Sequence, residues 1–179
     1  MSDEAVMTEI KNGDLDKAAI LFEKYHVRLF NFFVRLTGER DISHDLTQNL
    51  FWRLLKYRQS YHAGKTFKAW MYQIARNVFY DHHQAHKATQ NHRTTLEVLK
   101  DEVADTVEQM TQKEQEETLT KALQKLPADY REVLVLHKFD GMKYDEIAEI
   151  LQCSPSAAKV KAHRALKKLR ELYFLTENR

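Results

Sequence analysis

Hydrophobic residues recur at helical spacing through the first part of the chain. From Leu15 to Leu36 they fall on one side of a helix, at positions 15, 18/19, 22, 25/26, 29, 32/33 and 36, and Gly38 supplies a stop. A second helix is predicted to begin near Asp41 or Ser43, because either side chain can cap a first turn. Since its apolar stripe is matched by a polar face, one side of this helix should be buried and the other exposed.

A third long helix is predicted after a loop over residues 58–65. Thr66 is suited to cap this helix, which should run from Phe67 to about Lys87. The residues expected on its buried face are Phe67, Trp70, Met71, Ile74 and Val78. We therefore assign residues 1–92 to one compact helical domain.

The apolar pattern weakens beyond this domain. Residues 93–117 carry apolar side chains too sparsely to form a core, which favours a partly ordered linker. Further helices are predicted over 118–126, 129–139, 144–151 and 155–174, with breaks at Pro127, Gly141 and a turn at 152–154. The sequence therefore predicts an all-α protein: two small helical domains joined by a flexible linker, with residues 118–179 forming a helix-turn-helix domain.

Composition and charge refine this interpretation. Only four glycines and two prolines occur in 179 residues, which disfavours strands joined by tight turns. The net charge is only +2, but residues 97–117 hold eight acidic side chains against two lysines. Residues 153–170 hold six basic side chains and no acidic one. This asymmetry indicates contact with nucleic acid or an acidic surface near the carboxyl terminus.

The remaining composition bears on cellular location. The single cysteine, Cys153, excludes an intramolecular disulfide and fits a reducing cytoplasm, and we expect it to be a small buried residue. The acidic amino terminus lacks the features of a secretory signal, and the longest apolar run, residues 18–22, is too short to span a bilayer. We expect a cytoplasmic protein with no membrane insertion.

The helix-turn-helix pattern carries the strongest functional signal. Ala158, Ala162 and Ala165 on the last helix are small enough to let the preceding helix approach closely. The basic residues then fall on the exposed arc: Lys159, Lys161, Arg164, Lys167, Lys168 and Arg170. A merely solvated charged face is the alternative, but six cations without a compensating acid favour a nucleic-acid surface.

Enzymatic and metal chemistry find little support. His82 and His86 have the i, i+4 spacing of two metal ligands, but Asp81 is the only acidic residue beside them. The sequence shows no nucleophile–base pair and no phosphate-binding glycine loop. We predict that the chain is not an enzyme, that it has no metal site, other cofactor or small-molecule substrate, and that the histidines flank a nucleic-acid-facing helix end.

Both halves of the chain resemble the extracytoplasmic-function type of sigma factor of bacterial RNA polymerase. In the carboxyl-terminal half, residues 126–172 carry the family's motifs at the family's spacing: Leu126-Pro127, Arg131-Glu132-Val133, Gly141, Glu146-Ile147-Ala148, Ser154-Pro155, Lys159 and His163-Arg164-Ala165. In the amino-terminal half, the segment from Asp41 resembles the polymerase-clamp helix and the segment from Thr66 the promoter-melting helix. The residues that carry the second likeness are Phe67, Trp70, Ile74-Ala75-Arg76-Asn77 and Asp81.

The resemblance implies a role for each surface. Contact with core RNA polymerase would fall to Asp45, Gln48, Asn49, Trp52 and Arg53. Capture and melting of the minus-ten DNA would fall to Tyr61, Lys65, Phe67, Arg76, Asn77 and Tyr80, although Phe67 could equally be core, and Trp70 is better explained as core. Reading of the minus-thirty-five DNA would fall to Lys159, Val160, His163 and Arg164, with phosphate contacts from Lys161, Lys167, Lys168 and Arg170.

The same resemblance implies the partners, which are core RNA polymerase, promoter DNA and an anti-sigma factor. The acidic linker would thread toward the polymerase active-site cleft, or would serve only as a spacer. The alternative function is a free-standing helix-turn-helix regulator that binds duplex DNA without polymerase. Some positions depart from the family pattern, namely Asn49, Lys143, Gln152, Ala157 and Val160. Lys143 and Gln152 stand where a serine cap and a turn glycine are usual, each of which should cost about 1 kcal/mol.

Overall fold

The computed structural model describes residues 1–91 and 111–177, and these residues form helices and no strand. The amino-terminal half contains α1 (Asp3–Lys11), the short 3₁₀ turn η1 (Leu15–Lys17), α2 (Ala18–Thr37), α3 (Arg40–Lys56), a second 3₁₀ turn η2 (Arg58–Ser60) and α4 (Phe67–Asn91). The carboxyl-terminal half contains α5 (Gln112–Lys125), α6 (Ala128–Leu134), a π-helical turn η3 (Val135–Phe139), α7 (Tyr144–Leu151) and α8 (Pro155–Glu177). The prediction of an all-α fold is confirmed.

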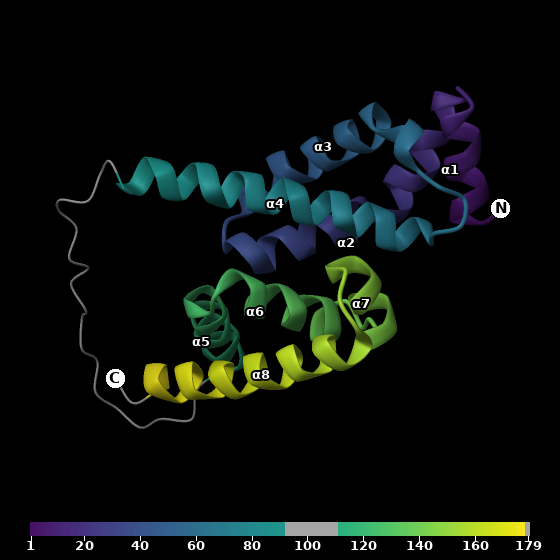
Figure 1. The fold of residues 1–179 in the computed structure, drawn as a ribbon. Helices are drawn as coiled ribbons and strands as arrows, with labels where there is room; N and C mark the ends of the chain where they lie inside the picture. Colours follow the sequence, from purple (N-terminus) through teal and green to yellow (C-terminus); the bar gives the residue numbers. More distant parts are fainter. Residues whose placement is uncertain (92–110, 178–179) are drawn as a thin grey trace.

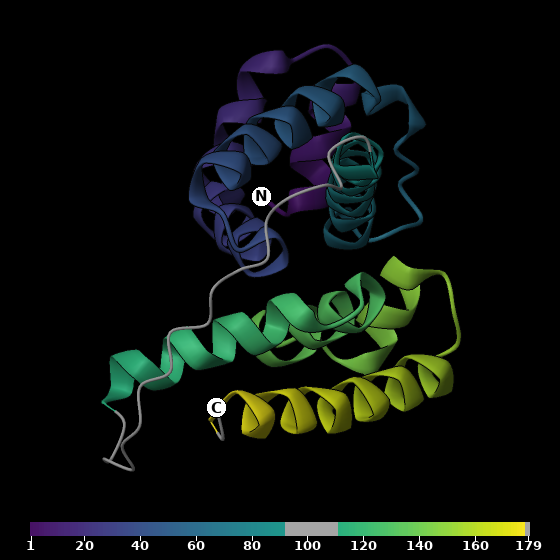
Figure 2. The ribbon, with the colours of Figure 1, turned by 90° about the vertical axis from the view of Figure 1, so that its left-hand side faces the viewer.

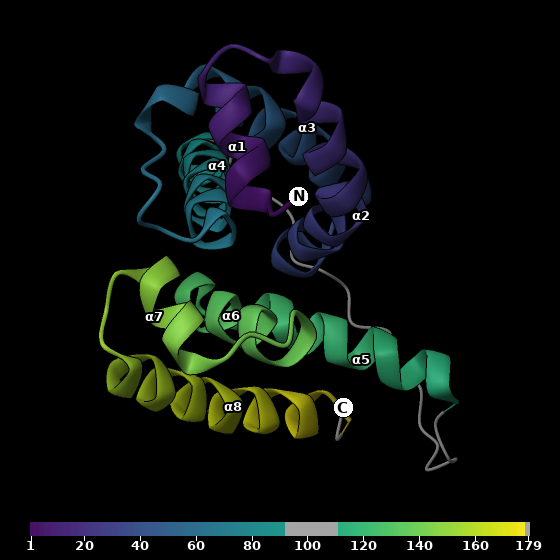
Figure 3. The same ribbon diagram turned by 90° about the vertical axis from the view of Figure 1, so that its right-hand side faces the viewer.

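The two halves form two layers that lie against each other (Figure 1). Helices α1 to α4 make one layer, and α5 to α8 make the other, with α6 and α7 facing the first layer. Helix α8 lies on the outer side of the second layer, away from α4, in all three ribbon views (Figures 1, 2 and 3). The predicted recognition helix therefore faces away from the amino-terminal half.

The amino-terminal layer is built around aromatic and aliphatic side chains of α2, α3 and α4. Phe32 meets Phe33 and Tyr72 edge to face, with ring centroids 5.5 and 5.3 Å apart, and all three side chains are buried. The apolar face of α1 closes one side of this core through Val6, Met7 and Ile10. This helix, which Ser2 caps, was not predicted from the periodicity.

Capping signals explain some helix boundaries and not others. The prediction that Asp41 or Ser43 caps the second helix was wrong: α3 begins at Arg40 after Glu39, which makes no side-chain cap hydrogen bond, and the Ser43 hydroxyl donates back to the Glu39 carbonyl. Thr66 accepts a hydrogen bond from the Ala69 amide at 3.3 Å, as expected for the cap of α4. Helix α5 begins earlier than the expected Thr118, because Thr111 and Glu114 form a reciprocal capping box. The predicted boundary at residues 92 and 93 and most of the predicted linker over 93–117 lie outside the described residues.

Candidate polymerase and promoter interfaces

The outer face of α3 presents a continuous polar surface. Asp45, Gln48, Asn49 and Trp52 follow one another at i, i+3, i+4 and i+7 and are all exposed, while Leu46, Leu50 and Leu54 point into the core. Trp52 keeps 57% of its surface exposed, and the Lys56 ammonium lies 4.5 Å from the centroid of its ring. An exposed tryptophan on an otherwise polar face is a typical anchor for a protein partner.

Arg53, the fifth residue predicted to contact polymerase, is placed differently. Its guanidinium lies 2.6 Å from a carboxylate oxygen of Asp81 on α4 and donates to the Asn49 side chain at 3.0 Å. Arg53 therefore ties α3 to α4 in this structure.

The six residues predicted to melt DNA divide into three groups, two of which are the exposed residues and the core residues. Lys65 and Asn77 are exposed, whereas Tyr61 and Phe67 are 1% and 0% exposed and belong to the core. Tyr61 donates its hydroxyl to the Lys65 carbonyl at 3.1 Å, and its ring meets those of Phe67 and Trp70. Trp70 is buried, as expected for a core residue. In this conformation the buried rings offer no surface to an unstacked base, so their role in melting stays a prediction.

Arg76 and Tyr80, the other two melting candidates, contact the carboxyl-terminal half. Arg76 Nε lies 2.7 Å from Oε1 of Glu132 on α6, and the Tyr80 hydroxyl donates to Oε2 of the same carboxylate at 3.0 Å. Glu132 is 1% exposed, and burial raises the pKa of its carboxyl group. The Arg76 N–H does not point along the line to Oε1, so this is a close ion pair without a well-oriented hydrogen bond.

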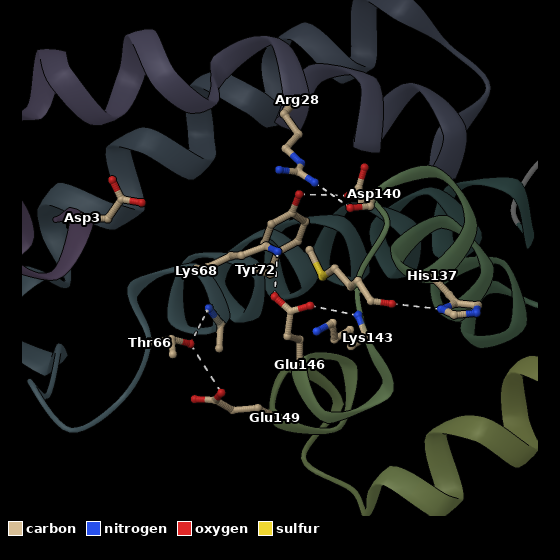
Figure 4. Close-up of polar contacts among 12 residues, drawn as sticks. Asp3, Arg28, Thr66, Lys68, Tyr72, His137, Asp140, Lys143, Glu146 and Glu149 are labelled. Atoms are coloured by element: carbon tan, nitrogen blue, oxygen red, sulfur yellow. Dashed lines mark hydrogen bonds and ion pairs between the residues drawn. The ribbon is translucent and has the colours of Figure 1, made fainter.

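Further polar contacts join the two halves along α4 and α2 (Figure 4). Lys68 lies 2.9 Å from Oε1 of Glu146, and the Tyr72 hydroxyl donates to Oδ2 of Asp140 at 2.9 Å. Arg28 on α2 donates to the Asp140 carbonyl at 2.6 Å. Burial raises the pKa of the Asp140 carboxyl group, which means that burial costs free energy when that group is ionised. These contacts, which periodicity could not predict, hold the two layers together.

The helix-turn-helix turn has the predicted form. Gln152 adopts φ 55°, the left-handed conformation that a glycine would accept without strain, and Ser154 accepts from the Ala157 amide at 3.1 Å. At Lys143, where a serine cap is usual, the side chain makes no cap hydrogen bond, and only the other half of a capping box is present: the Glu146 side chain accepts from the Lys143 amide at 2.9 Å. Cys153 is exposed, so the expectation that it is buried was wrong. Its amide bonds back to the Ala148 carbonyl while its side chain faces solvent.

Helix α8 offers an exposed cationic arc. Ala158, Ala162 and Ala165 are buried on its inner side, as predicted. The exposed residues on its outer side are Lys159, Val160, His163, Arg164, Lys167, Lys168 and Arg170. Lys161 is half-buried and lies 3.3 Å from a carboxylate oxygen of Asp129, so a phosphate contact would have to compete with that ion pair.

Within residues 1–91 and 111–177, no group of three histidine, cysteine, aspartate or glutamate side chains is arranged to hold a metal ion. None of the helices in this part of the chain is long and apolar enough to cross a membrane.

Comparison with known proteins identifies the class of this fold. The family model for Sigma-70 region 2 matches residues 21–89, and that for Sigma-70 region 4 matches residues 116–169. The RNA polymerase sigma factor CarQ of Myxococcus xanthus is 31% identical over 93% of this chain and 94% of its own length. The chain therefore belongs to the sigma-70 family of RNA polymerase sigma factors.

Other relatives define the type within this family. The extracytoplasmic-function (ECF) sigma factor EcfG of Rhodopseudomonas palustris is 30% identical over 80% of this chain and 78% of its own length. This likeness places the chain in the ECF type. Members of the family are not enzymes. The alternative of a free-standing regulator finds no support in these comparisons.

Two solved structures of complexes contain a chain with the same fold. The sigma factor RpoE in complex with the anti-sigma factor NepR from Bartonella quintana matches with a TM-score of 0.68 and 24% identity, covering 86% of this chain and 94% of that chain. CnrH in complex with the cytosolic domain of CnrY matches with a TM-score of 0.71 and 20% identity, covering 96% and 97% of the two chains. These likenesses confirm the fold of two helical domains.

Proposed function

We propose that this chain binds core RNA polymerase and directs it to promoters by recognising their minus-ten and minus-thirty-five elements. The observation that carries this proposal is the pair of sigma regions in family order, each with an exposed surface of suitable chemistry. The outer face of α3 offers a tryptophan within a polar surface, and the exposed side chains of α8 include five cations.

The two DNA-binding surfaces would bind different promoter elements. The minus-ten strand, once its bases unstack, would be held by Lys65, Arg76, Asn77 and Tyr80, with Tyr61 and Phe67 behind them. On α8, Lys159, Val160, His163 and Arg164 would reach base edges in the major groove, and Lys161, Lys167 and Lys168 would contact phosphates. Val160 would recognise a thymine by apolar contact with its methyl group, since the valine side chain has no hydrogen-bonding group.

Partners and location follow from the same proposal. An anti-sigma protein would hold the chain inactive until a signal arrives, as the complex of the sigma factor RpoE, which has a similar fold, with the anti-sigma factor NepR suggests. Polymerase acts in the cytoplasm, so the chain would work there as a protein without a membrane anchor. The domain boundaries at residues 92 and 118 and the acidic linker between them remain part of this proposal.

The test of this function is transcription in vitro with purified core polymerase, with and without the full chain, on fragments of the host genome. The chain should produce transcripts with defined start sites, and permanganate should detect unpaired thymines at their minus-ten elements. Core alone should produce neither. If no template gave a start site that depended on the chain, the proposed function would be wrong.

Two single substitutions on α8 distinguish recognition of bases from contact with phosphates. Arg164→Ala should weaken binding to the preferred minus-thirty-five duplex by about 1–3 kcal/mol and should relax the base preference at one position. Lys167→Ala should weaken binding to all sequences alike and reduce the dependence of affinity on salt. Fluorescence anisotropy with promoter variants at two salt concentrations measures both effects. Equal loss of sequence preference in the two variants would contradict the assignment.

A further inference from the structure

The segment between α3 and α4, residues 57–66, carries two of the residues proposed to hold the minus-ten strand, and we call it the α3–α4 connection. Tyr61 is buried, whereas residues 62–66, which include Lys65, form an exposed tip. This tip is closed by its own backbone, since the Lys65 amide donates to the His62 carbonyl at 3.0 Å. Because a short exposed turn has little core packing of its own, its position depends on what holds its two ends.

Helix α1 contacts the α3–α4 connection near both of its ends. On the α3 side, the Lys11 ammonium donates to the Tyr61 carbonyl at 2.6 Å, and the Gln59 side-chain amide donates to the Lys11 carbonyl at 2.9 Å. On the α4 side, the Glu4 carboxylate accepts from the Phe67 amide at 3.2 Å. Glu4 and Lys11 are seven residues apart in α1, so they lie on one face of it, about 10 Å apart along its axis. One helix therefore fixes the two ends of the connection relative to each other.

The contact between Glu4 and Phe67 also completes the start of α4. The first amides of a helix have no carbonyl partner within it, and a side chain or water must accept from them. Thr66 accepts from the Ala69 amide, and Glu4 accepts from the amide of Phe67, whose side chain is buried. A carboxylate is favoured at this end of α4, because the helix dipole is positive there. The first turn of α4 is thus capped in part by a side chain of another helix.

Helix α1 is itself fixed to the core of region 2. Its apolar face is buried there, and Asp3 joins it to α2. The Asp3 carboxylate lies 2.7 Å from the Lys24 ammonium and accepts from the Tyr25 hydroxyl at 2.5 Å. Asp3 therefore anchors α1 to α2, whereas Glu4 and Lys11 hold the connection. The two tasks fall to different side chains and can be separated by substitution.

We propose that Glu4 and Lys11 are positioning residues for promoter melting, which hold the α3–α4 connection in the shape that receives an unstacked base of the minus-ten strand. A segment that is already ordered loses less conformational entropy when the strand binds. A loosened connection is ready to bind in a smaller fraction of chains, and it fits different bases more equally. This inference rests on the proposed function and adds to it two side chains that act through the connection rather than by touching DNA.

Amide hydrogen exchange of the full chain, measured by mass spectrometry, tests whether α1 holds the connection. The double variant Glu4→Ala with Lys11→Met removes both contacts and keeps an apolar stem at position 11. Exchange in peptides that cover residues 57–67 should become about tenfold faster, because hydrogen bonds to charged groups oppose local opening. Peptides from residues 40–54 of α3 should exchange as in the unmodified chain.

The matched control for this variant is Asp3→Ala. It removes a neighbouring carboxylate from the same turn of α1, but the contacts that it breaks are those with α2. Exchange in residues 57–67 should therefore stay as in the unmodified chain. Equal acceleration by Asp3→Ala would mean that α1 supports region 2 only in general, and would overturn the proposed role of Glu4 and Lys11.

The consequence for melting is measured with core polymerase on a template at which the unmodified chain gives a defined start site. In the double variant, permanganate reactivity of the minus-ten thymines should fall about tenfold, because fewer chains hold the connection in the binding shape. Transcription should also vary less among templates with single-base changes in the minus-ten element, whereas binding of a minus-thirty-five duplex should be unchanged. Glu4→Gln keeps an acceptor oxygen and Lys11→Arg keeps a donor, so a chain with these two substitutions should recover most of the melting and of the base preference.

Gln59→Ala answers the same question if the double variant loses helical content. Gln59 is exposed, so its truncation removes one contact with α1 without disturbing the core, and exchange in the connection should become about threefold faster. Folded variants that keep the exchange rates, the melting and the base preference of the unmodified chain would overturn the inference alone. A lack of chain-dependent transcription with the unmodified chain would overturn the proposed function and this inference with it, so the two failures are distinguishable.

Discussion

Arg131→Ala is expected to lower the free energy of unfolding by about 3–5 kcal/mol, the largest effect of any single substitution considered. The guanidinium is buried and donates to the carbonyls of Leu123, Gln124 and Leu126, which close the turn between α5 and α6. It also donates to the Gln124 side chain and to the Leu36 carbonyl at the end of α2. Alanine would leave these acceptors buried without a donor and open a cavity between the layers.

Urea denaturation followed by circular dichroism measures this effect. Lys121→Ala, a substitution on the exposed side of α5, is the control and should change the free energy of unfolding by no more than about 0.5 kcal/mol. Arg131→Lys should recover only part of the loss, because an ammonium cannot reproduce the planar fork of donors. A loss below about 1 kcal/mol in Arg131→Ala would show that water satisfies the carbonyls instead.

Local signals in the sequence predicted much of the fold. The periodicity from Leu15 to Leu36, the cap at Thr66 and the turn ended by Ser154 each depend on residues within a few positions of one another. The alanine seam at 158, 162 and 165 was predictable for the same reason, since it requires only helical spacing. The exposed polar face of α3 follows from its apolar stripe. These features are set by local backbone chemistry.

The predictions from the sequence were wrong where the hydrophobic pattern was short or where the prediction was based on composition. Helix α1 contributes only three buried apolar residues, Val6, Met7 and Ile10, although Ser2 at its cap was a usable signal. Helix α5 begins with polar residues, and their acidic character suggested a linker although Thr111 and Glu114 fit a capping box. Cys153 was expected to be buried because cysteine usually is, whereas the turn at Gln152 directs its side chain outward.

The packing of the two halves could not be predicted from either half alone. Glu132 belongs to the Arg-Glu-Val motif of region 4, and nothing near it in the sequence indicates a partner in α4. Tyr72 and Asp140 are 68 positions apart, and only the assembled layers bring them to 2.9 Å. The exposure of the predicted melting surface depends on how the two domains pack, so the sequence of either domain alone could not predict it.

The α3 surface is different, because it is available in the packed state. Asp45, Gln48, Asn49 and Trp52 are exposed and make no contact with region 4 among the described contacts. A chain with its layers packed together can therefore present its predicted polymerase contact and its minus-thirty-five surface while Arg76 and Tyr80 on α4 are held by Glu132. Binding to polymerase is then the step that can draw the layers apart, since the two regions must reach promoter elements that lie well apart on the DNA.

Replacing both Gln48 and Trp52 by alanine is expected to abolish capture of core polymerase. A half-exposed tryptophan that becomes buried at the centre of an interface contributes about 2–4 kcal/mol, and Gln48 lies one turn away on the same face. Neither side chain belongs to the core, so the melting temperature of the variant should remain close to that of the unmodified chain. Pull-down of purified core polymerase with the tagged full chain measures the effect.

The control replaces a glutamine and an aromatic residue at exposed positions elsewhere. Gln84→Ala combined with Phe174→Ala removes one glutamine and one aromatic ring, the latter 57% exposed, without touching α3. This control should capture polymerase as the unmodified chain does. If the Gln48 and Trp52 variant is folded and still captures polymerase at the original level, the contact must lie on another surface. The exposed apolar residues of α2, among them Ile20 and Val27, would then be the next to test.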